Sequence, residues 1–238
     1  MKHICYTLMM VSMLTASCSS QYVVNGLSTV ESLEGKTLYL KVYKNENEDM
    51  QTIDSSNVVH GKFRFSGVLD STVMANVFLG ETSVMPVVIE EGQVSLKIDE
   101  NIQSATGTPL NDSLSSFIRR KTLLETQLAE LPRKEGQMIM DGMDIDEVTE
   151  RLREEAQGLS MQNDRLVTHF ILSNCNNVLG PGIFMILTSN YRFPILNPQI
   201  EEITTHASPY FMNHPYVREY LKAAEANMAK IREQHLKE

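Results

Sequence analysis

Cysteines are the residues of this chain best suited to covalent chemistry, and there are three: Cys5, Cys18 and Cys175. Cys175 lies in the polar run Ser173–Asn177, just after an apolar helical stretch. A catalytic thiol needs a neighbouring base and a lowered pKa. The nearest histidine, His169, is six residues earlier and would not share a helical face with it. We therefore expect Cys175 to be a small buried side chain, with redox sensing and catalysis as the alternatives.

Cys18 has a different setting, directly after an apolar N-terminal run. Lys2 and His3 give a basic start, and residues 4–16 carry no charge. This pattern is typical of a secretion signal that is too short to span a bilayer as a mature helix. The run ends in LTASC at Leu14–Cys18, which resembles a bacterial lipobox. The resemblance implies that Cys18 is acylated and becomes the N-terminus after cleavage; the alternative is an ordinary signal peptide.

Lipid attached at Cys18 would hold the protein on a membrane of the cell envelope, because several acyl chains anchor a protein stably. Ser19 follows the cysteine, where an aspartate would signal retention in the inner membrane. We therefore expect the outer membrane. No acidic cluster follows Cys18, which favours the periplasmic side over the cell surface.

Two histidines, His206 and His214, flank a short loop in which a metal could bind. Zinc needs three or four ligands, and no nearby carboxylate or thiol has ligand spacing. Three acidic pairs, at 90–91, 154–155 and 201–202, consist of adjacent residues, which diverge on a helix or strand instead of converging on one site. We predict no metal, no cofactor and no catalytic residues, and we expect a protein that is not an enzyme.

One apolar segment, Gln137–Met143, is expected to be the loop between two long helices. Loop tips are usually polar. Here Met138, Ile139, Met140 and Met143 offer flexible apolar side chains, which suit adaptable contact surfaces. We expect them to fold back onto the helices, with a contact to a partner protein or to lipid as the alternative.

Composition limits the possible partners. The chain has 238 residues, enough for one large domain or two small ones, and 42% of them are hydrophobic, so a packed core is expected. The formal net charge of −9 argues against nucleic acid and against an anionic membrane surface as the main partner.

Short strands dominate residues 22–107, which we predict to form a β-sandwich-like domain. In the run 36–43 the apolar residues alternate with polar or aromatic ones, as in a half-buried strand. The segment Ile53–Leu69 reads as two strands joined by a tight turn at His60-Gly61. Met85–Ile89 is apolar throughout and is expected to be covered on both sides. About seven such strands at regular spacing indicate an antiparallel sandwich or barrel-like sheet.

Helical spacing takes over at Thr108-Pro109, where a threonine cap is followed by proline at the first helical position. Pro132 is expected to end this helix. A second long helix should begin at Asp144, which with Glu147 resembles a capping box. The two would form an antiparallel helix hairpin, and short helices should follow.

Strands followed by helices indicate an α+β fold. The expected division is a lipoprotein signal peptide at 1–17, a tether at 18–21, the β-sandwich-like domain at 22–107 and a C-terminal helical region at 108–238. This helical region contains the long hairpin.

Five runs, in order after the lipobox-like segment, resemble a known family: Gly35–Leu40, Ile53–Ser55, Gly61–Gly67, Ile89–Gly92 and Gly107–Asn111. The family is an uncharacterised N-terminal domain, domain-of-unknown-function family 4369. It typically precedes a thioredoxin-like, disulfide-reductase-type domain in envelope lipoproteins of Gram-negative bacteria. The similarity covers about Tyr22 to Asn111.

The chain departs from those relatives because it contains no Cys-x-x-Cys, so the redox activity that the resemblance implies has no residues to carry it here. We expect a non-enzymatic binding or scaffolding module, and the resemblance implies a thioredoxin-like partner. One alternative is a thiol-dependent oxidoreductase that relies on Cys175. Another is a glycan- or peptide-binding lipoprotein, for which Tyr39 and Tyr43 on one strand face are the only indication.

Overall fold

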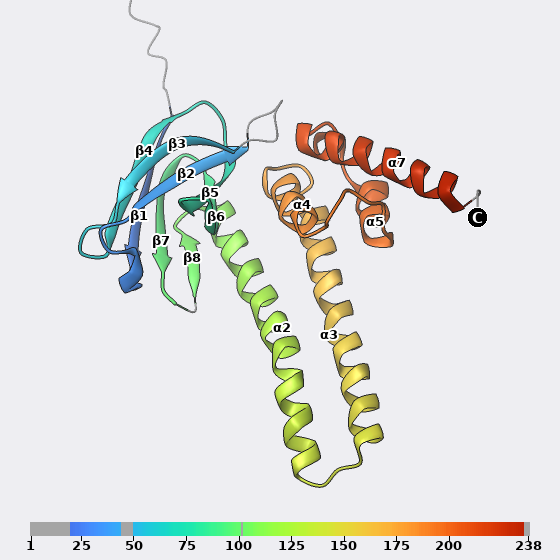
Figure 1. Cartoon of the computed structure of the whole chain (residues 1–238). Helices are drawn as coiled ribbons and strands as arrows, with labels where there is room; N and C mark the ends of the chain where they lie inside the picture. The colour runs from blue at the N-terminus through green and yellow to red at the C-terminus, as the bar shows by residue number, and fades with distance from the viewer. Residues whose placement is uncertain (1–19, 44–49, 101, 236–238) are drawn as a thin grey trace, which may run out of the picture.

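The computed structural model describes residues 20–43, 50–100 and 102–235. They form an α+β structure with eight strands followed by helices. The strands make two four-stranded sheets, and the helices lie to one side of them (Figure 1). The proposed signal peptide at 1–17 and the proposed lipidation site Cys18 lie outside the described residues.

One sheet has the strand order β4-β1-β7-β8. Its members are β1 (Ser20–Ser28), β4 (Lys62–Leu69), β7 (Gly92–Ile98) and β8 (Gln103–Thr106). β1 pairs antiparallel with β4 but parallel with β7. The expectation of a wholly antiparallel sheet is therefore wrong at this pair. β7 does not follow β1 in a hairpin but returns from the other sheet, and this long connection allows it to enter in the parallel direction.

The other sheet has the order β3-β2-β5-β6 and is antiparallel throughout. Its members are β2 (Thr37–Tyr43), β3 (Met50–Asn57), β5 (Val73–Leu79) and β6 (Thr82–Ile89). A short 3₁₀ turn, η1 (Glu31–Leu33), links β1 to β2. The alternation predicted for β2 is confirmed, since Leu38 and Leu40 are fully buried.

Apolar side chains from both sheets meet in one core. Val24 of β1, Phe65 of β4, Leu40 of β2 and Val87 of β6 are all completely inaccessible. The prediction that Met85–Ile89 is covered on both sides is also confirmed. Alternate residues of β6 point into the sandwich core, whereas Val88 belongs to a second core formed with the helices.

Contrary to the simple hairpin expected over Ile53–Leu69, β3 and β4 belong to different sheets. The tight turn itself is present, with His60 at φ 51° and Gly61 at φ 70°. Only Val59 and Lys62 form a bridge next to it. Further along, side chains of β3 replace the missing ladder: Asp54 Oδ2 accepts the Ser66 N–H at 2.9 Å and Ser56 Oγ accepts the Arg64 N–H at 3.0 Å. The chain thus changes sheets at this turn because β4 finds its backbone partner in β1.

The start of a helix, α2 (Pro109–Met140), covers the sandwich at the edge strands β6 and β8. Asn111 is fully buried, and its side chain bonds both backbone groups of Val88 in β6, at 2.9 and 2.8 Å. Ser115 bonds both backbone groups of Ala105 in β8, at 2.9 and 2.6 Å. The helix therefore satisfies the edge strands of both sheets at once.

A long antiparallel hairpin of α2 and α3 (Ile145–Ser173) projects away from the rest of the molecule (Figure 1). The prediction that Pro132 ends the first helix is wrong: α2 continues for two more turns, to Met140. Packing outweighs the lost hydrogen bond, because Leu131 on one side of the proline and Met138 on the other contact Val148 and Leu152 of α3. The predicted cap of α3 is confirmed, since Asp144 accepts the N–H groups of residues 146 and 147.

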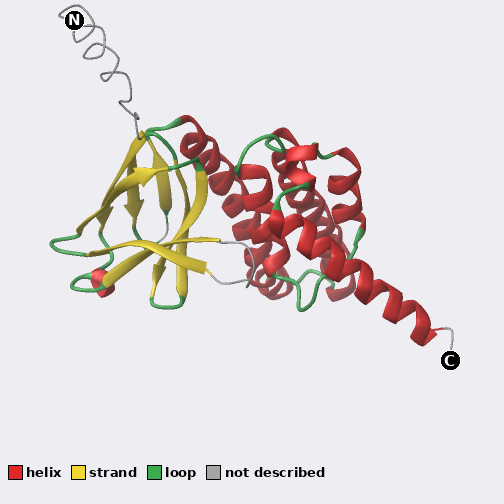
Figure 2. Cartoon of the chain, turned by 90° about the horizontal axis from the view of Figure 1, so that it is seen from above, coloured by secondary structure: helices red, strands yellow, loops and turns green. Residues whose placement is uncertain are grey.

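Four more helices complete the fold: α4 (Leu179–Ser189), α5 (Pro198–His206), α6 (Pro209–Met212) and α7 (Pro215–His235). Seen from above, they form a bundle beside the sandwich (Figure 2). Gly182 lets α4 approach the sheet closely, since a Cβ there would lie 2.0 Å from the Met74 sulfur of β5. Tyr43 of β2 contacts α7, with its ring 5.3 Å from that of Tyr216 and its hydroxyl 3.2 Å from Glu219.

Candidate functional site

A cavity of about 310 Å³ lies where the helix hairpin meets α4, and we call it the α4 groove. Three helices and one residue of β6, Pro86, line it. Its apolar walls come from six side chains: Phe117, Ile118, Val167, Ile183, Ile186 and Leu187. A concave, mostly apolar site with a few polar groups is the usual form of a binding pocket.

The sequence positions these walls through the close approach of α4 to its neighbours. Gly180 leaves no room for a side chain, since a Cβ would lie 2.6 Å from the Asn174 carbonyl oxygen. Phe184 is fully buried among aromatic rings, with Phe211 at 5.3 Å and Tyr220 at 5.4 Å between ring centroids. This packing holds α4 in place on the face that points away from the groove. On the groove side, Ile186 and Leu187 are only partly buried.

One polar atom in the groove has no partner. Asn163 Oδ1 is buried and accepts no hydrogen bond from any residue that the structure describes. At the rim, Lys121 pairs with Glu125 one turn further along α2, and Asp164 adds a second carboxylate. The groove can therefore hold an apolar group and accept a hydrogen bond from a donor attached to it.

Cys175 and His169, the pair weighed as a thiol and its base, have separate roles. Cys175 is half-buried and packs against the helical core, and its carbonyl oxygen accepts a hydrogen bond from Ser208 Oγ. His169 is exposed, and its Nδ1 lies 3.4 Å from Ser173 Oγ. Cys175 therefore packs as the small side chain that we expected, but it is only partly buried and not fully buried as predicted.

The two histidines considered for metal binding also lie in different environments. His206 is exposed at the end of α5, with Nδ1 2.8 Å from the Glu202 carbonyl oxygen. His214 is half-buried before α7, and burial lowers the pKa of its imidazole. Within the described ranges, no three His, Cys, Asp or Glu side chains come together in a way that could hold a metal ion.

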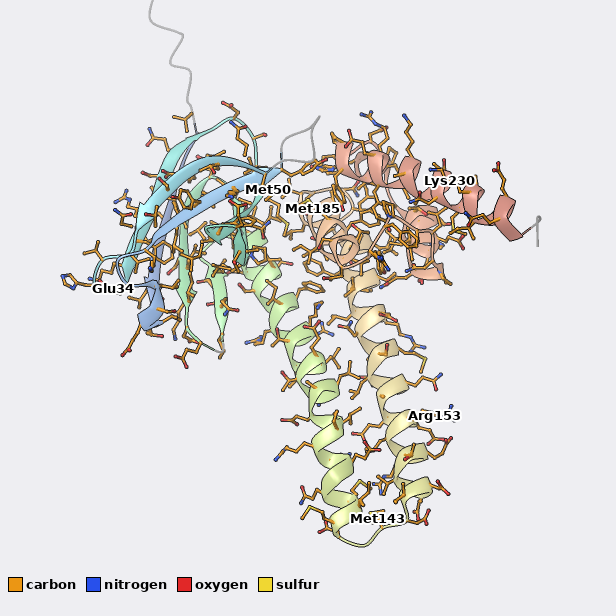
Figure 3. All side chains as sticks on the ribbon, viewed as in Figure 1. Glu34, Met50, Met143, Arg153, Met185 and Lys230 are labelled. Atoms are coloured by element: carbon orange, nitrogen blue, oxygen red, sulfur yellow. The ribbon has the colours of Figure 1, made fainter. Side chains whose placement is uncertain are left out.

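The apolar segment at the hairpin tip divides into two halves. Met138 and Met143 pack against the cluster that joins the two helices, in line with the expectation that the segment folds back. Met140 is 88% exposed and Ile139 36% exposed. Figure 3 shows Met143 at the far end of the hairpin, remote from both the sandwich and α7. The expected loop is also shorter than predicted, because α2 runs to Met140.

Tyr39 and Tyr43, the aromatic residues considered for ligand binding, are both partly buried. Tyr43 takes part in the contact with α7 described above. None of the helices that the structure describes combines the length and apolar character needed to cross a bilayer.

Comparison with protein families identifies the N-terminal part of the chain. Residues 22–114 match the family model described as a domain of unknown function, DUF4369. This part of the chain is a DUF4369 domain. The resemblance seen in the sequence is thereby confirmed. No curated protein matches the chain.

The DUF4369 domain ends inside α2, shortly after Asn111, the residue that closes the sandwich. Apart from Pro86, every residue that lines the α4 groove lies in the helical region. Sequence reasoning missed this groove and Asn163. The available signal was a polar pair, Asn163-Asp164, next to the apolar residues Leu166 and Val167 of α3.

Proposed function

We propose that this protein is a lipid-anchored module of the cell envelope that binds a protein partner and performs no chemistry of its own. The lipobox-like sequence ending at Cys18 supports the anchor. The DUF4369 resemblance supports a role beside thioredoxin-like proteins, with which such domains typically occur. The binding site in this proposal is the α4 groove.

The unpaired Asn163 Oδ1 is the observation that carries the proposal. A buried acceptor without a donor costs about 1–3 kcal/mol, so a protein does not usually keep one without a use. A partner segment that placed an apolar side chain between α2 and α4, and shifted the side chains that now cover Asn163 Oδ1, could donate a backbone N–H to this oxygen. Binding would then remove the cost as well as bury the apolar walls.

The charges around the groove favour recognition by shape and hydrogen bonding. Lys121 and Glu125 neutralise each other at the rim. Asp164 alone adds charge, and its backbone oxygen accepts a hydrogen bond from Gln199 at 3.2 Å. We therefore expect an occupant with an apolar side chain next to an amide donor, and no requirement for a strongly charged ligand.

A photo-crosslinking amino acid at Thr122, on the exposed rim of the groove, tests the site in intact cells. The matched control is Thr126, a second exposed threonine one turn further along α2, which lines none of the cavities described. We expect a defined adduct from position 122 and none from position 126. Asn163→Leu should abolish the adduct while raising the free energy of unfolding by about 1 kcal/mol, because it removes the unpaired acceptor.

An adduct that persists in Asn163→Leu would contradict this use of the groove. The anchor is tested separately: the wild-type chain should incorporate a clickable fatty acid and pellet with membranes. If Cys18→Ala does both equally well, lipidation at Cys18 is wrong.

A further inference from the structure

The helix hairpin has a second unpartnered face, on the side opposite the α4 groove. An open groove of about 570 Å³ runs there between α2 and α3. Its lining combines three basic residues, Arg120, Arg165 and His169, with three leucines, Leu123, Leu124 and Leu166. We call it the arginine face. Leu123 is 61% exposed, although it is a large apolar side chain.

Every charged residue that lines the arginine face is basic, in a chain whose net charge is −9. Neither guanidinium has an ion-pair partner among the residues that the structure describes. No carboxylate lies one turn before or after Arg120 or Arg165 in its own helix. Positive charge is therefore concentrated beside exposed leucine, an arrangement complementary to a surface that is both acidic and apolar.

The other end of the same hairpin provides such a surface, which we call the acidic tip. Met140 is 88% exposed and Ile145 60% exposed. Around them, Asp141, Asp144 and Asp146 are exposed carboxylates that have no ion-pair partner within the described part of the chain. One molecule thus carries two complementary surfaces that cannot reach each other within that molecule.

We propose that two copies of this chain associate through their hairpins, each acidic tip lying on the arginine face of the other copy. From Arg120 to Met140 the helix rises by about 30 Å, at about 1.5 Å per residue. At about 3.6 residues per turn, Asp141 lies about five turns after Leu123 and so faces the same side of the hairpin as the arginine face. Two hairpins lying antiparallel with an overlap of that length would place this side of each tip on the arginine face of the other copy. The arrangement has two-fold symmetry and is closed, so it gives dimers and not filaments.

The rest of the hairpin is compatible with this overlap. Between the two surfaces, Lys134 of α2 and Glu155 of α3 form an ion pair at 2.6 Å, so these two side chains neutralise each other within the overlap. The hairpin extends beyond the sandwich and the helical bundle, which leaves its length open to a second copy (Figure 1).

Paired cysteines test the geometry in membranes from cells that make the full chain. Leu123 and Met140 lie about 25 Å apart along α2, so a short bismaleimide cannot join them within one molecule. We expect Leu123→Cys/Met140→Cys to give a crosslinked dimer. The matched control is Thr122→Cys/Met140→Cys, because Thr122 is adjacent but lines the α4 groove. The wild-type chain measures any background from its own cysteines.

Charge exchange tests the chemistry of the contact. Added to the crosslinking pair, Arg120→Glu/Arg165→Glu should lower the yield of dimer about tenfold, and Asp141→Lys/Asp146→Lys should do the same. All four changes together should restore the yield to within about threefold of the parent, because opposite charges again face each other. All of these side chains are exposed, so the variants should fold.

The proposal is overturned if the Leu123 pair gives no more dimer than the Thr122 pair. It is also overturned if either charge reversal leaves the yield unchanged, or if the four changes together fail to restore it. Adducts with other proteins in place of a dimer would assign the arginine face to a different partner. These results do not depend on the α4 groove, so they can fail while the proposed function stands.

Discussion

At the scale of single residues, one carboxylate holds the turn where the chain passes between the two sheets. Glu34 accepts the N–H of His60 through one oxygen at 2.8 Å and that of Gly61 through the other at 2.9 Å. Gly61 has a positive φ, and a Cβ there would lie 2.4 Å from the Ser28 carbonyl oxygen. The turn is thus fixed from outside by Glu34 and admits only glycine at its second position.

Because these two backbone hydrogen bonds favour the ionised form, they lower the pKa of Glu34 below its ordinary value of 4.5. Their stabilising contribution is complete above pH 4.5 and is lost as the pH falls through the lower pKa of the folded protein. We predict that Glu34→Gln reduces the loss of thermal stability on acidification from pH 5 to pH 3. Unfolding temperatures measured across this range check it, with Glu31→Gln as a control for net charge. Parallel curves for wild type and Glu34→Gln would contradict it.

His214 should produce a pH dependence at higher pH. Its Nδ1 is buried without a partner among the described residues, and burial lowers the pKa of the ring. The unfolded chain therefore takes up a proton near pH 6.5 before the folded protein does, so stability falls as the pH drops below about 6.5. We predict that His214→Phe is more stable than wild type at pH 5.5 and that the difference shrinks at pH 8. Urea denaturation at both pH values measures it; an equal difference at the two would show that His214 does not titrate on unfolding.

At the scale of elements, periodicity in the sequence predicts most strands and helices, but not the partner that each one finds. It also misses the short strand β8 and the single-turn helix α6, which lies where a loop was expected between His206 and His214. The strands around His60-Gly61 and the turn itself follow from alternation and glycine chemistry. That β3 and β4 enter different sheets follows from the pairing of β4 with β1, which is remote in sequence. The prediction that Pro132 ends α2 fails for the same reason. The leucine and methionine contacts that stabilise α2 beyond this proline are made with α3, a different element.

Pro132 should therefore be a weak point in a helix that packing maintains. It is exposed and lacks the N–H that would bond the Leu128 carbonyl. We predict that Pro132→Ala raises the free energy of unfolding by about 1–3 kcal/mol. Gly136→Ala is the comparison in the same helix: a Cβ there has nothing within 4 Å, so the gain should be about 1 kcal/mol. A lower stability of Pro132→Ala would mean that the hairpin requires a bend at this residue.

At the scale of the whole molecule, α2 is both the lid of the sandwich and the first arm of the hairpin. Its first turns bond the edges of both sheets, and Leu114 and Phe117 then enter the helical core. Composition and the order of elements predict two regions that meet near residue 108. They do not predict that the boundary is bridged by buried side-chain hydrogen bonds, because Asn111 reads as an ordinary polar residue in the first turn of a helix.

Asn111 should consequently control the stability of both regions. Its side chain is fully buried and makes two hydrogen bonds to Val88 and a third, at 2.8 Å, to Thr108 Oγ1. Asn111→Ala leaves the N–H and C=O of Val88 buried and unpaired, so we predict a loss of about 2–4 kcal/mol in the free energy of unfolding. The matched control is Asn227→Ala, which removes one partly buried bond to the Pro194 carbonyl and should cost about 1 kcal/mol. Denaturation followed by far-ultraviolet circular dichroism, which reports mainly helix, and by hydrogen exchange of the β6 and β8 amides should show both signals shifting together in Asn111→Ala. If β6 and β8 exchange faster while the helical transition stays in place, α2 does not couple the two regions.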